Sequence, residues 1–242
     1  MTGAPAQAPE TRRLDAELPE GDDKHQAVEA MFDRIAPQYD RLNRVISLGQ
    51  DRRWRRRTVA ALGLESGATV LDVACGTGDL CDVLAETGYR AIGLDFSAGM
   101  LAAAHTAAPL VRADALRLPV ADAAVDGVVS GFALRNLVGL EQFFRESARA
   151  VRPGGRVAAL ETAEPSSAVL RAGHHVWFRR IVPFVGARLS HDPDAYSYLP
   201  RSSAYLPPPR VLVAMVTAAG FEAVERRTFM AGAVQLITGR RR

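Results

Sequence analysis

An apolar run that ends in a glycine turn constrains this chain more than any other feature. Residues 70–74 are Val-Leu-Asp-Val-Ala, and Cys-Gly-Thr-Gly follows at 75–78. Such a run is typical of a strand buried on both faces of a parallel sheet. Gly76 and Gly78 remove two Cβ atoms where the chain must turn sharply and where a ligand must touch the backbone. We expect a helix over 79–87, with free backbone N–H groups at its start.

A second apolar run, at 91–95, ends in the carboxylate of Asp95. A glycine turn followed by an acid at the next strand tip is how a doubly wound sheet holds adenosine, because the acid accepts both ribose hydroxyls. A dinucleotide site would carry a third glycine, in G-x-G-x-x-G, where this chain has Cys81. The pattern apolar–apolar–Asp–apolar–x–x–Gly–x–Gly instead resembles the first motif of class I S-adenosylmethionine (SAM) methyltransferases. The alternative is an ordinary buried strand and turn.

The resemblance implies an α/β fold: a Rossmann-like, doubly wound, mostly parallel sheet of seven strands with an N-terminal helical lid and an inserted helical cap. The 242 residues suffice for one such domain. Residues 1–22, rich in Ala, Pro, Glu and Asp, are expected to be a disordered leader. We expect the methyltransferase domain at 23–242, with the cap insertion at about 163–208. The strands at 221–227 and 233–238 should form an antiparallel hairpin at the sheet edge.

The same resemblance places the cofactor at the tips of successive strands. Ser97 is expected to cap a helix over 98–107, in which Met100 packs either on the adenine or in the core. Asp114 fits the exocyclic amine of the adenine, with the backbone of Ala115 beside it, although a capping role for Asp114 is the alternative. The residues expected to hold the cofactor are Tyr39, Asp72, Cys75, Gly76, Thr77, Gly78, Asp95, Phe96, Met100, Asp114, Ala115, Gly131 and Phe132.

Three further motifs narrow the family. They are Y-D-x-x-N-x-x-x-S-x-G-x-x-x-x-W-R at 39–55, F-A-L-R-N at 132–136 and Y-x-Y-L-x-x-S at 196–202. Together they resemble the UbiE/MenG/COQ5 family, the C-methyltransferases of menaquinone and ubiquinone biosynthesis. The resemblance implies that the helix carrying the first motif is a lid on the SAM pocket. This chain departs from the family pattern at Ala133, which replaces a glycine, and at Gly131, where many members have a serine.

The activity implied is SAM-dependent C-methylation of demethylmenaquinol to menaquinol. A ring carbon is a poor nucleophile unless an adjacent hydroxyl loses its proton, so a fixed cation beside that oxygen should help. The resemblance implies that Arg135 and Asn136 act near the reacting ring; the alternative for Arg135 is a salt bridge that supports the strand tip. An arginine will hardly be the base itself, and His191 is the best candidate by its pKa. Tyr196 could hydrogen-bond the quinol. No metal ligand set is expected.

Two other functions stay open. The first is a C- or O-methyltransferase acting on a soluble phenolic or polyketide specialised metabolite. The second is a SAM-binding member of the family that no longer transfers methyl groups. Nucleic acid is not expected as a partner, because residues 132–135 are Phe-Ala-Leu-Arg rather than an Asn-Pro-Pro-Tyr base clamp.

Charge and amphipathic patterning bear on location. The arginine cluster at 52–57 fits a solvated helix face, a lipid headgroup contact or, least well, nucleic acid. Residues 169–189 have the pattern of a basic amphipathic helix, typical of an interfacial segment or of a cover over a substrate tunnel. We see no run long enough to span a membrane and no secretory signal. We expect a cytoplasmic protein. The sequence leaves open whether it contacts the inner face of the membrane and whether it forms a homodimer.

Overall fold

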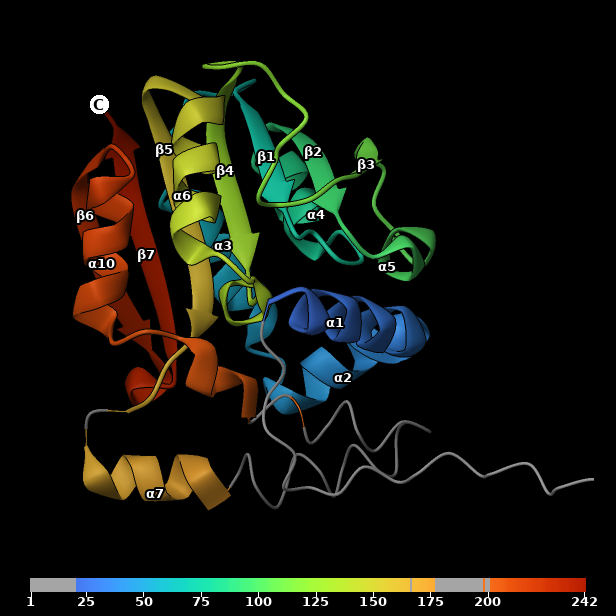
Figure 1. Cartoon of the computed structure of the whole chain (residues 1–242), viewed down its shortest axis with the longest axis vertical. Helices are drawn as coiled ribbons and strands as arrows, with labels where there is room; N and C mark the ends of the chain where they lie inside the picture. The colour runs from blue at the N-terminus through green and yellow to red at the C-terminus, as the bar shows by residue number, and fades with distance from the viewer. Residues whose placement is uncertain (1–20, 166, 177–197, 199–200) are drawn as a thin grey trace, which may run out of the picture.

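A computed structural model of the chain describes residues 21–165, 167–176, 198 and 201–242 (Figure 1). Its centre is a seven-stranded sheet in the order β3-β2-β1-β4-β5-β7-β6. Strands β1 to β5 pair in parallel, whereas β7 runs antiparallel to both β5 and β6. The predicted doubly wound sheet with an antiparallel edge hairpin is therefore confirmed. The strands are β1 Thr69–Val73, β2 Arg90–Asp95, β3 Leu110–Arg112, β4 Val125–Gly131, β5 Val151–Thr162, β6 Phe221–Phe229 and β7 Val234–Arg241.

Helices cover both faces of the sheet. Successive residues of β1 face opposite ways, so Val70 joins one hydrophobic cluster while Leu71 and Val73 join the other. The Val70 cluster includes side chains of two helices, α3 and α4; the Leu71 cluster includes side chains of α6 and α10. Two-sided burial explains why β1 is a continuous apolar run. These four helices are α3 Asp51–Ala60, α4 Asp79–Glu86, α6 Leu140–Ala150 and α10 Pro209–Ala218.

Two N-terminal helices lie across the carboxyl ends of the parallel strands (Figure 1). These are α1 (Gly21–Ile35) and α2 (Tyr39–Ile46), joined by the short helix η1 (Ala36–Gln38) that contains Pro37. Helix α1 begins at Gly21, two residues before the predicted start of the domain. Together α1, η1 and α2 form the predicted lid.

Polar contacts fix α1 to the tips of three strands. The Asp33 carboxylate accepts hydrogen bonds from the Ser97 hydroxyl and from the Gly99 amide (2.8 Å) just beyond β2. Glu29 pairs with Arg112 at the end of β3 at 2.9 Å. Lys24, the only lysine, donates from Nζ to the Leu137 carbonyl at 2.9 Å beyond β4.

Several predicted boundaries are wrong. Helix α5 (Ala98–Ala102) stops five residues before the predicted end, because the chain then turns back and the His105 amide donates to the Thr77 carbonyl at 3.2 Å. Strand β5 starts at Val151 rather than at 157, because Val151 already pairs with Val125 of β4, ahead of a register shift in the ladder. In the cap region the described elements are α7 (Ala168–Val176) and the short helix η4 (Ser203–Tyr205); the rest of the predicted helix over 169–189 lies outside the described residues.

Candidate functional site: two cavities at the carboxyl ends of the strands

A cavity of about 790 Å³ lies between the strand tips and the lid. Its walls include nine of the thirteen residues predicted to hold the cofactor, and also Asn136 from the predicted catalytic set. We call it the first cavity. The nine are Tyr39, Gly76, Asp95, Phe96, Met100, Asp114, Ala115, Gly131 and Phe132.

The carboxylate of Asp95 joins the tips of two strands. One oxygen accepts the Gly76 amide at 2.8 Å from the turn after β1, and the other accepts the Ser97 amide at 2.9 Å after β2. Burial raises the pKa of Asp95 above its usual value, although these backbone hydrogen bonds favour the charged form. A carboxylate held at this strand edge suits a ribose, since it can accept from both hydroxyls.

An aromatic wall and an acid form the other end of the first cavity. The Phe96 ring meets the edge of His25 from α1, with 4.0 Å between ring centroids. Asp114 Oδ1 accepts the Leu116 amide at 2.8 Å, which fixes the carboxylate in the cavity wall. Met100 is almost fully buried and also lines this wall. Such a wall suits a flat heterocycle with an exocyclic amine, and the adenine contact at Asp114 stays a prediction.

The two motif glycines have different roles. Gly76 has φ +57° and lines the cavity; a Cβ there would meet only Tyr39 Cε1, at 3.8 Å. Gly78 has φ +96° and does not line it, because a Cβ would fall 2.4 Å from Thr106 Cγ2. The missing side chain at Gly78 lets the returning chain pack on the turn, and the role of Gly78 in holding the cofactor stays a prediction. Ala74, which was not predicted, lines the cavity with φ +58°.

Asp72, Cys75 and Thr77 were also predicted to hold the cofactor, and none of them lines the first cavity. Asp72 is fully buried below the turn, and its Oδ2 accepts the Cys81 thiol at 3.4 Å. Its Oδ1 has no hydrogen-bond partner among the described residues. Burial is the main reason that the pKa of Asp72 rises to about 7. Thr77 donates its hydroxyl to Asp40 of α2. Asp72 and Thr77 thus tie the turn to α4 and to the lid, and a role of these residues in holding the cofactor stays a prediction.

A second cavity, of about 1260 Å³, lies on the other side of Phe132. Phe132 lines both cavities, and its φ of +60° is unusual for a residue with a bulky side chain. Trp54 packs edge-to-face on this ring, with 6.2 Å between centroids. Arg55 pairs with Asp51 at 2.7 Å and with Asp79 at 2.9 Å, which ties α3 to the start of α4. The W-R pair of the first motif therefore supports the partition between the cavities.

Arg135 lies in the second cavity, not in the first. Its guanidinium pairs with Glu161, which is completely buried, and its backbone amide donates to the same carboxylate at 3.1 Å. Thr162 donates to Glu161 from its amide at 2.7 Å and from its hydroxyl at 3.1 Å. The expectation of a guanidinium facing the SAM crevice is wrong, and the alternative, a salt bridge at the strand tip, is what the structure contains. Arg135 still lines a cavity.

Asn136 and Tyr39 lie near the partition. The Asn136 amide donates to the Phe132 carbonyl at 3.4 Å and accepts the Tyr198 hydroxyl at 3.3 Å. Burial raises the pKa of the Tyr39 phenol, and the charges of Arg55 and Arg135 oppose that rise. His191 and Tyr196 lie outside the described residues.

Comparison with known proteins settles the family. The sequence profile described as the ubiE/COQ5 methyltransferase family matches residues 20–241. The chain belongs to this family. The predicted family and the predicted methyltransferase activity are thereby confirmed.

Relatives of this ubiE/COQ5 chain are similar over most of its length. A protein of Roseiflexus sp. (strain RS-1) named demethylmenaquinone methyltransferase is 43% identical over 232 residues, covering 93% of this chain and 98% of the relative. A protein of the same name from Mycolicibacterium paratuberculosis (strain ATCC BAA-968 / K-10) is 42% identical over 210 residues, which cover 86% of this chain and 91% of the relative. A crystal structure from Thermotoga maritima, of a SAM-dependent methyltransferase described as a possible histamine N-methyltransferase, has a TM-score of 0.62 at 17% identity. It covers 89% of this chain and 100% of that one, and supports the fold alone.

Sequence reasoning missed the part of the site that comes from α1 and β5. His25, Val28, Glu29 and Phe32 of the lid all line the first cavity. Val28 and Phe32 have helical spacing, but that spacing equally fits core packing and so carried no functional signal. Glu161 was missed because the sequence alone does not reveal which cation will pair with an acid inside an apolar strand.

Replacing Asp95 by Asn tests the cofactor assignment. The amide keeps the shape, but one of its two groups is now a donor that opposes the Gly76 or Ser97 amide. A charge-assisted hydrogen bond contributes about 1.5–3 kcal/mol, so SAM affinity measured by calorimetry should fall at least about tenfold. Asp82→Asn, a half-exposed acid on α4 outside both cavities, is the control. Equal affinities for the two variants would remove Asp95 from the site.

Asp72 gives a pH-dependent prediction. Because its folded pKa is raised, its contribution to stability is fully present below its ordinary pKa and is lost as pH rises through about 7. Asp72→Asn removes this titration. The stability of the variant relative to the parent, measured by chemical unfolding, should therefore increase between pH 4 and pH 7, by roughly 1.4 kcal/mol per pH unit at most. A difference independent of pH would show that Asp72 is ionised in the folded protein.

Proposed function

We propose that this chain transfers the methyl group of SAM to a ring carbon of demethylmenaquinol, giving menaquinol and S-adenosylhomocysteine. The observation that carries the proposal is the pair of cavities that share Phe132 as a wall. One has the donors and acceptors for an adenosine, and the other is mostly apolar with a buried arginine. Relatives that are 40–43% identical have the name demethylmenaquinone methyltransferase, which supports the same substrate.

S-adenosylmethionine is the methyl donor, and the first cavity fits it. Asp95 can accept from its ribose, the wall at Phe96 and Asp114 can hold its adenine, and Gly76 leaves the backbone bare beside it. When bound, it supplies an electrophilic methyl group on a sulfonium.

The protein must turn a ring carbon into a nucleophile and align it with that methyl group. Loss of a proton from the neighbouring hydroxyl makes the carbon nucleophilic, and the fixed charge of Arg135 stabilises the resulting oxyanion. Glu161 holds that guanidinium in place, so little reorganisation is needed during the reaction. Asn136, anchored to the Phe132 carbonyl and to Tyr198, positions the edge of the ring at the partition. Alignment of this kind can supply roughly 7–11 kcal/mol.

The hydroxyl proton must leave for a base before methyl transfer. After the transfer, the hydrogen on the methylated carbon must also leave as a proton, and the oxygen takes up a proton, which restores the aromatic quinol. Arg135 does not serve as that base, because an arginine side chain stays protonated in proteins. His191 remains the proposed base and Tyr196 the proposed donor to the quinol.

The direct test is an assay with SAM and either a demethylmenaquinol or a panel of soluble phenols, with products identified by mass. We expect a gain of one methyl group on the quinol carbon. Methylation of the soluble phenols alone would favour the specialised-metabolite alternative, and no methylation of either class would favour a SAM-binding protein without transferase activity.

A second test removes the charge of Arg135. Substituting it alone would leave Glu161 buried and unpaired, at a cost of about 3–5 kcal/mol, so the double variant Arg135→Met with Glu161→Gln is preferable. Single-turnover methylation should slow by about 10²–10³-fold, with SAM affinity nearly unchanged. The control is Arg152→Met with Asp126→Asn, which removes an ion pair outside both cavities. An unchanged rate in the Arg135 variant would exclude the guanidinium from the mechanism.

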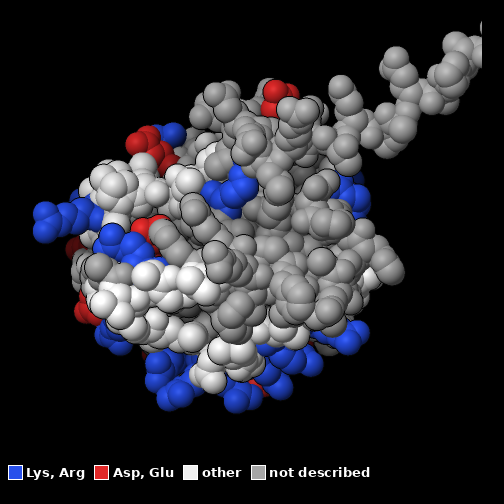
Figure 2. All heavy atoms as spheres, turned by 90° about the horizontal axis from the view of Figure 1, so that it is seen from below, with Lys and Arg blue, Asp and Glu red and all other residues white. Residues whose placement is uncertain are grey.

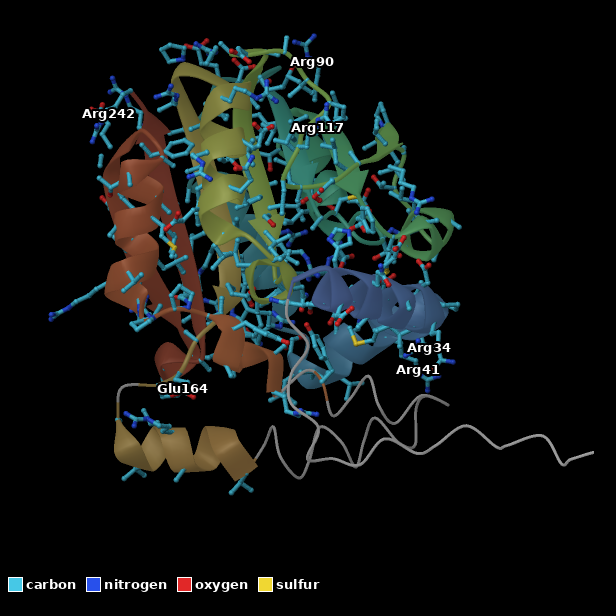
Figure 3. The ribbon with its side chains drawn as sticks, in the orientation of Figure 1. Arg34, Arg41, Arg90, Arg117, Glu164 and Arg242 are labelled. Carbon is cyan, nitrogen blue, oxygen red and sulfur yellow. The ribbon has the colours of Figure 1, made fainter. Side chains whose placement is uncertain are left out.

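We also propose that the mouth of the second cavity contacts an anionic membrane surface. Among the described residues, no helix has the length and apolar character needed to cross a bilayer. Three apolar side chains from different segments line the cavity and are exposed: Leu48 (60%), Met230 (47%) and Leu170 (47%). Basic side chains gather along one rim of this face (Figure 2). Arg34 and Arg41 lie at the lid end of the molecule, opposite to Arg90 and Arg117 (Figure 3).

Vesicle sedimentation tests this contact. Leu48→Glu and Met230→Glu should each reduce binding to phosphatidylglycerol vesicles several-fold, because each puts a carboxylate against an anionic surface. Val111→Glu is the control, since Val111 is a similarly exposed apolar residue on β3. Equal binding by all three variants, or no binding by the parent chain, would contradict a membrane contact at this mouth.

A further inference from the structure

The polar groups of the second cavity are mostly engaged with one another. Ser47 donates to Asp51 at 3.0 Å, and Asp51 pairs with Arg55. Thr162 donates to Glu161, which also pairs with Arg135. Because these charges already have partners, the described lining offers little to a phosphate or a carboxylate. An uncharged or weakly polar ligand fits better.

Among the buried polar atoms that have no partner in the described part of the chain, two are nitrogen donors: Nδ2 of Asn43 and Nε of Arg135. Both side chains line the second cavity. A buried donor without an acceptor is unfavourable, so such atoms mark where a ligand supplies the missing acceptors. Because these two nitrogens need acceptors, we expect the ligand to carry oxygen atoms that accept from them.

Asn43 and Arg135 come from separate parts of the chain and line the same cavity as Phe132. Asn43 lies one turn after Tyr39 on α2, and Arg135 lies in the short helix Leu134–Asn136, three residues after Phe132. Tyr39 lines the first cavity. The two donors therefore lie close to Phe132, where the methyl group passes from the cofactor to the acceptor, and not at the mouth of the second cavity.

We infer that Asn43 is a specificity-determining residue whose side-chain amide donates a hydrogen bond to the second ring oxygen of the acceptor. Arg135 stabilises the first, the one beside the carbon that is methylated. This assignment rests on the proposed function, and it gives one donor to each of the two oxygens of a quinol ring. A ring with a single oxygen leaves the Asn43 amide without an acceptor, and the cavity discriminates against it.

The experiment compares a short-chain demethylmenaquinol with the matching naphthol, which keeps the hydroxyl beside the reacting carbon and lacks the other. The parent chain should prefer the quinol by about tenfold or more in kcat/KM, the loss expected for one unpaired buried donor. Asn43→Leu should lose most of this preference, by lowering kcat/KM for the quinol while changing that for the naphthol little. Asn43→Asp, which keeps the shape and loses the donor, should behave in the same way and serves if the leucine variant does not fold.

Gln50→Leu is the matched control. It removes a side-chain amide seven residues later, from a residue that lines neither cavity, and should keep the parent preference. SAM affinity should be equal in all the variants. A parent chain that methylates the quinol, with variants at 43 that keep its full preference, would overturn the inference and leave the proposed function intact. A parent chain that methylates neither ring would instead overturn the proposed function.

Discussion

The carboxylate of Asp95 is the constraint on which the rest of the site depends. It accepts one amide from the turn after β1 and another after β2, so two strand tips are fixed to a single charged group. Parallel pairing of these strands brings the tips to the same edge, and the lid closes over them through the Asp33 contacts. Gly76 leaves bare backbone beside the carboxylate. The first cavity follows from these few contacts.

Phe132 is the second constraint. Its side chain forms a wall of both cavities, and its left-handed backbone is stabilised by the packing of Trp54 and by the network that includes Arg55. Residues in such strained conformations commonly occur at functional sites, where the surrounding structure offsets their cost. The arrangement separates the first cavity, which Asp95 and Asp114 line, from the second cavity, which Arg135 lines while paired with Glu161.

The contrast between prediction and structure has a physical pattern. Features set by local sequence were predictable: the buried strands, the acid at the tip of β2, the cap at Ser97 and the antiparallel edge hairpin. Features set by contacts between distant segments were not. Gly78 accommodates Thr106, and Arg135 pairs with Glu161 on a neighbouring strand. Likewise Asp72 carries the motif pattern but is fully buried beside the Cys81 thiol, a contact that the pattern does not predict.

The most direct test of the account is a crystal structure of the chain with S-adenosylhomocysteine and a demethylmenaquinone bound together. The account predicts the ribose on Asp95, the adenine between Phe96 and Asp114, and the sulfur at Phe132 facing a quinone ring in the second cavity. A ribose bound away from Asp95, or a quinone ring outside the second cavity, would contradict it.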